Sequence, residues 1–575
     1  MARHATVCVI IALIALLPAG TAEAHASLVR STPAAGTTVP AAPPELVLEF
    51  TEELDPQFST VRLLNSTNQV VNAGPGAVDP AAPRVLRLAL GELPKDSYSA
   101  LFKVRSAVDG HITEGNLPFG IGVPSVGSLI PAADAPDPAT LPPPLLSSAL
   151  RWLNLLAAAF AFGGVPFALL VWRPVFQSAP RNGAERAAAD AAMTRALRSL
   201  IAGGSVLFLL VTLVFLVAQA AEAAGVSLTQ ALGGPVMQLA RGRSGQFLLV
   251  RISIALALVA LAWRLPSAGR GPQWPWWVAL ALAGAALLSF SLTGHAAALQ
   301  QGASAAIALD WLHLAAMVTW LGGLVPLAIA IRAARRAPKQ ALALGPVASR
   351  FSRLAMICVA LLVLSGLYSY IQHVNALDLL AATSYGRALA VKLGLFGLLI
   401  LLGAVNARML LPRLRALGTR FAGALGWSVR TELIAGMLLL LAVGVMTSVA
   451  PSRIAWEEHE RRGLALPASE GEVDMVLRIA PAWVGDNEFA VDVTDKRAGA
   501  QGKAAKVLLR FDMVGMQMGK LQTEAQPTGT ERYTARGSFV SMGGRWHVEV
   551  VLRRAGFQDV RHRFEVDILR AAAGV

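Results

Sequence analysis

Three patterns of hydrophobic and polar positions follow one another along the chain. In residues 25–123 and 473–569, apolar and polar side chains alternate over short runs, as at 46–50. Alternation with a period of two is typical of strands that bury one face. Between these regions, apolar stretches of about twenty residues recur, the length of a helix that spans a bilayer. The pattern predicts a β domain, a helical membrane domain and a second β domain.

The middle of the chain contains eight predicted membrane spans. They lie at approximately 150–172, 197–219, 246–264, 275–293, 306–330, 354–373, 388–409 and 431–449. Over its 575 residues the chain is 55% hydrophobic and only 15% charged, which is unusual for a soluble protein of this length. Composition therefore supports a lipid bilayer as the surroundings of this region.

The chain starts with the pattern of a secretory signal peptide, residues 1–24. Arg3 supplies the positive start, residues 7–17 form an apolar run too short to span a bilayer, and the Ala-Glu-Ala sequence at 22–24 is a small-x-small cleavage site. Cleavage there makes His25 the first residue of the mature chain. The first β domain is then expected outside the cytoplasm.

Basic side chains between the spans predict the same orientation. Loops after the first, third, fifth and seventh spans carry most of the Arg and Lys residues, and the alternate loops carry few, chiefly Arg241 and Arg243. Basic loops stay in the cytoplasm, so both chain ends are expected on the periplasmic side of a bacterial inner membrane. Much of the net charge of +14 lies in these loops, and no basic face with interleaved aromatics predicts nucleic-acid binding.

The fold class that follows is a multi-domain membrane protein. It comprises an Ig-like β-sandwich, an eight-helix transmembrane bundle and a small C-terminal β-sandwich. The expected segments are a signal peptide (1–24), the first β domain (25–123), a Pro/Ala-rich linker (124–147), the transmembrane domain (148–450) and the outer C-terminal domain (451–575).

The first β domain contains residues suited to a copper ion. An N-terminal histidine offers its amine and its ring Nδ1 as one chelate, and planar nitrogen donors favour Cu(II). Asp109 and His111 are two residues apart, so in an extended segment they face the same side and could bind an ion held by His25. Cys8 lies in the signal peptide and Cys358 in a span, which excludes a disulfide framework and a thiolate cluster. Taken alone, a histidine beside a cleavage site is also explained by chance.

The same residues carry a family resemblance. The sequences His-Ala-Ser-Leu at 25–28, Ser-Thr-Pro-Ala-Ala-Gly at 31–36 and Asp-Gly-His at 109–111 resemble the CopC family of periplasmic copper proteins. The resemblance implies that His25, Asp109 and His111 bind Cu(II). The domain contains no methionine, so the Cu(I) site of some family members is not expected. An oxidative copper enzyme is disfavoured, because a domain of this size leaves little room for a flat polysaccharide-binding surface.

Ionisable side chains inside membrane spans are costly and therefore mark candidate functional sites. Asp310, His313 and Met317 lie along one stripe of the fifth span, while His295 ends the fourth span and His373 ends the sixth. We expect the three histidines and Asp310 near the outer mouth of the bundle, as a candidate copper path that includes Met317. Ordinary interfacial histidines and packing are the alternative, and Asp310 could instead orient His313.

This region resembles the CopD family over approximately residues 148–450. The matching stretches are Asp-Trp-Leu-His at 310–313, Trp-Leu-Gly-Gly at 320–323, Arg-Phe-Ser-Arg-Leu at 350–354, Ser-Gly-Leu-Tyr at 365–368 and Thr-Ser-Tyr-Gly-Arg at 383–387. The resemblance implies copper transport into the cytoplasm or copper resistance, two opposite benefits that share one architecture.

The C-terminal domain holds a group of soft side chains. Its candidate Cu(I) ligands are Met513, Met516, Met518, Met542 and His547. Thioethers select Cu(I), although methionines that fill a β core and a structural histidine explain the pattern equally well. The domain resembles the small YtkA-like and FixH-like β domains.

Together these observations predict a copper-binding inner-membrane protein for copper import, homeostasis and resistance, which captures Cu(II) outside and passes it to the membrane domain. The alternative is a periplasmic copper store, or a donor to cuproproteins, without transport. Periplasmic copper chaperones or cuproproteins are candidate partners. A haem-binding cupric reductase is disfavoured because the histidines cluster on one side, and no P-loop predicts ATP-driven pumping. We expect no enzymatic activity.

Overall fold

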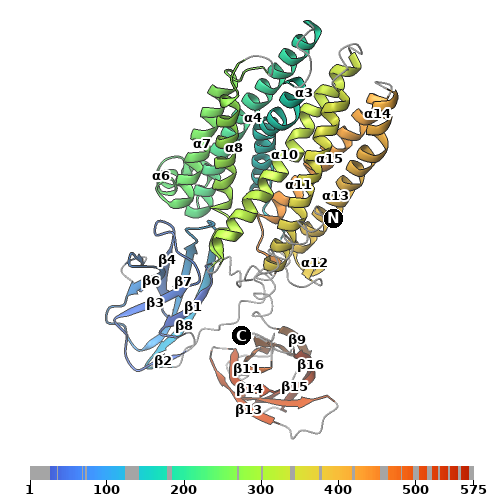
Figure 1. Cartoon of the computed structure of the whole chain (residues 1–575). Helices are drawn as coiled ribbons and strands as arrows, with labels where there is room; N and C mark the ends of the chain where they lie inside the picture. Colours follow the sequence, from blue (N-terminus) through green and yellow to red (C-terminus); the bar gives the residue numbers. More distant parts are fainter. Residues whose placement is uncertain are drawn as a thin grey trace.

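The protein consists of an N-terminal β domain, a helical bundle and a C-terminal β domain (Figure 1). The computed structural model describes residues 26–34, 37–67, 69–71, 74, 76–123, 142–177, 184–267, 271–299, 302–336, 344–373, 379–417, 421–452, 464–480, 482, 484–495, 504–514, 521–528, 531–541, 544–554 and 558–568.

The N-terminal domain is built from two four-stranded sheets. One contains, in spatial order, β1 (Leu28–Thr32), β3 (Glu45–Phe50), β6 (Ala82–Ala89) and β5 (Ala77–Asp79); the other contains β2 (Thr38–Val39), β8 (Ile112–Ile121), β7 (Asp96–Arg105) and β4 (Thr60–Leu64). The alternation predicted at 46–50 is confirmed, because Leu46, Leu48 and Phe50 are buried. The β7–β8 hairpin ends in the turn that carries Asp109 and His111.

The bundle contains eight helical spans long and apolar enough to cross a membrane, which confirms the predicted number. They are Leu145–Gln177, Ala187–Ala224, Arg243–Ala262, Trp274–Ser291, Ala303–Arg336, Leu344–Ile371, Ser384–Ala416 and Ala422–Met446. The first runs through α2 (Leu145–Pro166), the π-helical η1 (Phe167–Trp172) and α3 (Arg173–Gln177). The others correspond to α4 (Ala184–Ala224), α7 (Arg243–Ala262), α8 (Trp274–Ser291), α10 (Ala303–Arg336), α11 (Leu344–His373), α13 (Ser384–Val405) with η3 (Asn406–Leu410) and α14 (Leu411–Leu417), and α15 (Ala422–Met446).

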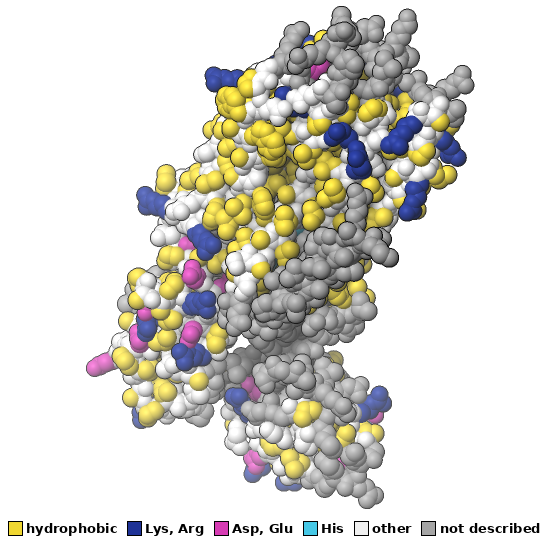
Figure 2. All heavy atoms as spheres, viewed as in Figure 1, with side chains coloured by type: hydrophobic (Ala, Val, Ile, Leu, Met, Phe, Trp, Pro, Cys, Tyr) yellow, Lys and Arg dark blue, Asp and Glu magenta, His cyan; other side chains and the backbone are white. Residues whose placement is uncertain are grey.

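Helices α2 and α10 pack together with very little space between their backbones. A Cβ atom added to Gly163 would lie 2.5 Å from the Cα of Gly322, so neither position accepts a larger side chain without movement. Short helices link the spans at the end nearer the β domains: α5 (Leu228–Ala231), α6 (Gly234–Arg241), α9 (His295–Ala298) and α12 (Leu379–Ala382). On the face drawn in Figure 2, apolar side chains gather over the bundle.

The C-terminal domain is one eight-stranded antiparallel sheet. In spatial order its strands are β16 (Val560–Ile568), β15 (Gly544–Arg554), β12 (Ala504–Met513), β13 (Leu521–Pro527), β14 (Arg532–Val540), β11 (Gly485–Asp495), β10 (Val473–Ala480) and β9 (Leu464–Glu470). The β-rich fold is confirmed, and its sheet is barrel-like because the end strands meet: His562 Nδ1 of β16 lies 2.7 Å from Glu470 Oε1 of β9. Closure of this kind leaves few unpaired strand edges.

Both β domains lie at the same end of the bundle (Figure 1). A chain that crosses a membrane eight times returns to the side on which it started, so the segments before the first span and after the last span lie on the same side. Several Lys and Arg side chains lie toward the opposite end (Figure 2).

Candidate metal centre

The turn between β7 and β8 fixes the position of an aspartate and a histidine. Ser106 Oγ accepts hydrogen bonds from the backbone N–H groups of Val108 (3.1 Å) and Asp109 (3.2 Å). Gly110 has φ +78°, and a Cβ atom there would lie 2.7 Å from Arg105 Nη2. Only glycine suits this position, so the Asp-Gly-His sequence follows from the shape of the turn as well as from its chemistry.

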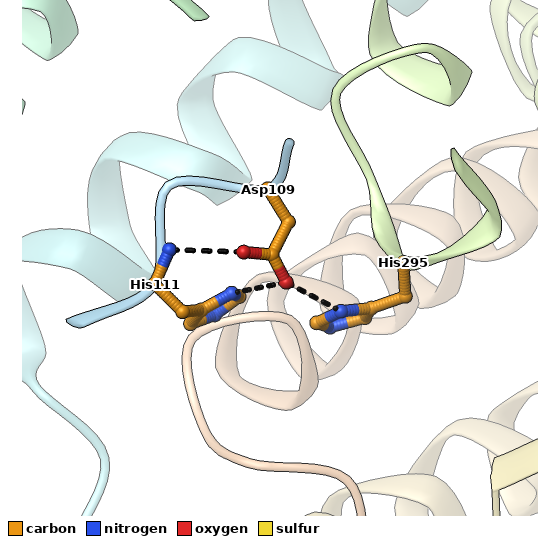
Figure 3. A group of neighbouring side chains, drawn as sticks. All are labelled: Asp109, His111 and His295. Atoms are coloured by element: carbon orange, nitrogen blue, oxygen red, sulfur yellow. Dashed lines mark hydrogen bonds and ion pairs between the residues drawn. The ribbon is translucent and has the colours of Figure 1, made fainter. Parts of the chain in front are cut away.

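Asp109 lies at the centre of the site, between two imidazole rings (Figure 3). Its Oδ1 accepts a hydrogen bond of 3.0 Å from the backbone N–H of His111, and its Oδ2 lies 2.8 Å from His111 Nδ1. The same Oδ2 lies 3.1 Å from Nδ1 of His295, a residue of the membrane domain 186 positions further along the chain. The side chain of Asp109 is only 1% exposed.

His295 reaches the site from the short helix α9, which Gly294 begins after the end of α8. Its ring is stacked against that of His111, with centroids 5.1 Å apart and planes inclined by 17°. Each histidine side chain is 19% exposed, whereas both ring nitrogens of His111 are buried. The site is therefore shared between the N-terminal domain and the membrane domain.

Asp109, His111 and His295 form the candidate metal site among the described residues, because one donor atom from each lies within 4.8 Å of the others. Burial by itself raises the pKa of Asp109, but the interactions with His111 and His295 lower it by more than burial raises it. The pKa is therefore held well below its usual range, and the carboxylate stays charged. Ligand atoms about 2.0 Å from a metal and at right angles to one another are about 2.8 Å apart. The distances from Asp109 Oδ2 to the Nδ1 atoms of His111 and His295, 2.8 Å and 3.1 Å, are close to that value. Two imidazoles and a carboxylate suit Cu(II).

A buried contact between the domains, which we call the docking contact, holds the two halves together. Its centre is Arg105, whose Nη1 lies 2.7 Å from Asp55 Oδ2 and whose two Nη atoms each lie 3.2 Å from Ser244 Oγ at the start of α7. Phe58 lies beside it, buried in an apolar cluster from α4 to α7 that includes Leu239 and Leu248. Arg105 is 1% exposed and Phe58 6%.

Two arginines of the bundle lie near the site. Arg151 of α2 interacts electrostatically with Asp109 and with Glu222. Arg251 of α7 is buried and is close enough to Arg151 to interact with it. Positive charge therefore lies on the membrane side of the carboxylate.

The structure does not bring all of the predicted copper ligands together at one site. His25 lies outside the described residues, and so does the side chain of His373. His313 Nδ1 lies 2.9 Å from Ser365 Oγ, and Met317 is buried in the bundle core. Asp310 interacts electrostatically with His295, and its place on a copper path stays a prediction.

In the C-terminal domain, Met513 packs against the barrel core, next to Gly544. His547 instead lies on the other face of the sheet, where its Nε2 is 3.4 Å from Glu565 Oε1. The structure therefore does not bring Met513 and His547 together. Met516, Met518 and Met542 lie outside the described residues.

Sequence reasoning missed two features of this centre. It placed His295 at a mouth facing the first domain but did not join it to Asp109 and His111, because docking depends on contacts between distant segments. It also passed over Arg251, although an arginine inside the third apolar span is a signal of function.

Family models match the N-terminal domain and the membrane domain, and one relative matches nearly the whole chain. Family models match at residues 28–122 (CopC domain), 142–306 (Copper resistance protein D-like, N-terminal domain) and 345–446 (Copper resistance protein D). The chain is 26% identical over 565 residues to Copper transport protein CutJ of Bacillus subtilis (strain 168), covering 95% of this chain and 96% of that protein.

Two further relatives match parts of the chain. Copper resistance protein D of Pseudomonas syringae pv. tomato is 28% identical over 265 residues, covering 44% of this chain and 84% of that protein. The crystal structure of CopC from Methylosinus trichosporium OB3b is 35% identical, with a TM-score of 0.16, over 17% of this chain and 93% of that one. The C-terminal likeness to YtkA-like and FixH-like domains stays a prediction. The chain belongs to the CopC/CopD copper-resistance family, with a CopC domain and both parts of copper resistance protein D in one polypeptide.

Proposed function

We propose that the chain captures Cu(II) outside the membrane at the site shared by Asp109, His111 and His295, and passes it into the membrane domain for copper import or resistance. The observation that carries this proposal is the single carboxylate oxygen that lies within 3.1 Å of an imidazole nitrogen from each domain. An ion at this position is bound by both domains at once. Transfer then needs no release into bulk water.

His25 is the fourth ligand in this proposal. The described chain starts with Ala26, which is fully buried in the N-terminal domain, and with Ser27, whose N–H donates to Thr51 Oγ1 at 3.0 Å. If the signal peptide is cleaved before His25, a free amine joins the donor set. Its ordinary pKa of about 8 lets Cu(II) displace a proton near neutrality.

The onward path runs along α10. With a rise of about 1.5 Å per residue, Asp310 lies about 10 Å and His313 about 15 Å from the start of the helix at Ala303. Asp310 interacts electrostatically with both His295 and Lys392. His295 is thus the membrane domain's first ligand, and Asp310 and His313 are the next polar groups inward.

The orientation in this proposal places both β domains in the periplasm. Eight spans and two β domains at one end of the bundle support it, and the Lys and Arg residues at the opposite end would face the cytoplasm. A copper ion that enters at the shared site then travels inward along α10.

The full chain reconstituted in vesicles tests the proposal. We expect wild-type protein to move copper across the bilayer and His295→Ala and His313→Ala each to lower the rate, while His562→Ala in the C-terminal barrel serves as the matched control. Copper binding without movement would support the store or donor alternative instead. Intact mass of the purified chain should show His25 as its first residue.

A further inference from the structure

We propose that Arg251 is a positioning residue that holds His295 in place for copper, a role that rests on the proposed shared site. Arg251 lies on α7, eight residues after Arg243, so it is about 12 Å inside the bundle. Burying a charged side chain at such a position costs free energy, so its presence there indicates a function.

The hydrogen bonds of Arg251 show what it holds. Its Nε donates to Ser289 Oγ (2.8 Å), and its Nη2 donates to the backbone oxygen of Ser289 (2.9 Å) and to Thr293 Oγ1 (2.7 Å). Its guanidinium also covers the ring of Phe290, 3.8 Å from the centroid. These partners are the last turn of α8 and the residue two positions before His295.

The end of α8 would otherwise be weakly fixed. The last carbonyl groups of a helix lack partners within it, and Arg251 satisfies that of Ser289. Thr293 is held twice, because its hydroxyl also donates to the Ser289 carbonyl at 2.9 Å. From this anchored turn the chain passes through Gly294 directly to His295.

Within the described part of the chain, Arg251 forms no ion pair with a carboxylate, and its hydrogen-bond acceptors are all neutral oxygens. The charged group with which it interacts electrostatically is another cation, Arg151. A structural ion pair therefore does not explain its burial. Its hydrogen bonds to the segment before His295 explain the burial of Arg251 instead.

Cu(II) affinity of the full chain, measured by competition with a chelator, tests this role. Loss of a direct outer partner of a metal ligand lowers affinity about tenfold to a hundredfold. Because Arg251 acts through Thr293 and the end of α8, we expect Arg251→Met to lower affinity by about tenfold, the lower end of that range. Pulsed EPR should show that one imidazole has left the Cu(II) signal. Thr293→Val, which keeps the arginine, should lower Cu(II) affinity by less than Arg251→Met does. Arg251→Lys should also lose less affinity than Arg251→Met.

The double variant decides whether Arg251 acts through His295. Adding Arg251→Met to His295→Ala should cause no further loss of affinity. An equal loss in that background, or unchanged affinity and EPR signal in Arg251→Met, would overturn the role of Arg251 while leaving the shared site intact. Unchanged affinity in His295→Ala alone would overturn both.

Arg198 of α4 provides a matched control. Its guanidinium also binds a backbone carbonyl near a helix end, that of Leu265, but after α7 at the opposite end of the bundle. Arg198→Met should therefore leave Cu(II) affinity and the EPR signal unchanged. A loss equal to that of Arg251→Met would show a general effect on the bundle and contradict the proposal.

Discussion

Phe58→Ala separates docking of the N-terminal domain from the chemistry of the copper ligands. Phe58 is 6% exposed and packs into the cluster of α4, α6 and α7, and its ring is 5.7 Å from the guanidinium carbon of Arg105. Truncation of a buried phenylalanine costs about 3–5 kcal/mol. A loss of about 3 kcal/mol from docking would lower its equilibrium constant about a hundredfold.

The expected result is a bounded loss of Cu(II) affinity. Undocking removes His295 from the site and leaves the ligands of the N-terminal domain unchanged, so Phe58→Ala should weaken binding no more than His295→Ala does. Hydrogen exchange at α6 should become faster, because Leu239 of this helix and Phe58 belong to one buried apolar cluster. Copper should restore part of that protection, since binding and docking stabilise one another.

Chelator competition and hydrogen-exchange mass spectrometry on the full chain measure both quantities. Leu101→Ala, on the exposed side of β7, is the matched control and should change neither. Wild-type affinity and protection in Phe58→Ala would refute the docking argument. A loss larger than that of His295→Ala would show that Phe58 acts on the other ligands.

Three further predictions follow from single positions. Gly110→Ala should lower the melting temperature of the N-terminal domain by calorimetry, because the φ of +78° and the 2.7 Å approach to Arg105 strain any Cβ atom; an unchanged transition would contradict this. Gly163→Val should make the detergent-solubilised bundle aggregate at lower temperature on size-exclusion chromatography, because the α10 backbone lies 2.5 Å from the added carbon, and wild-type behaviour would be unexpected. Burial by itself raises the pKa of Asp492, but Arg532 and Arg478 lower it by more, so the pKa of Asp492 in the folded state is depressed. Its stabilisation of the barrel should be present above about pH 4 and be lost as the pH falls; hydrogen exchange of β11 should speed up on acidification in wild type and less so in Asp492→Asn.

The sequence predicted those features that depend on local pattern. Alternation at 46–50 and the eight apolar stretches each report the surroundings of a single segment, and these predictions are confirmed. The barrel-like closure of the C-terminal domain was not predicted, because it depends on β9 meeting β16 about ninety residues later.

The candidate site divides in the same way. Asp109 and His111 belong to one short motif, so their proximity could be expected from spacing alone. His295 joins them only because Phe58 and Arg105 dock on the bundle, and no local pattern encodes that contact. The predicted orientation brings His295 to the correct end of the bundle, but it does not identify the two residues with which His295 shares a site.

The docking contact has a consequence for how tightly the domains must associate. Two separate proteins usually need more than about 1,200 Å² of buried surface for a stable complex, because association costs translational and rotational freedom. Here one chain carries both partners, so each domain meets the other at a high effective concentration. A contact centred on one phenylalanine and one arginine is then sufficient to assemble the site.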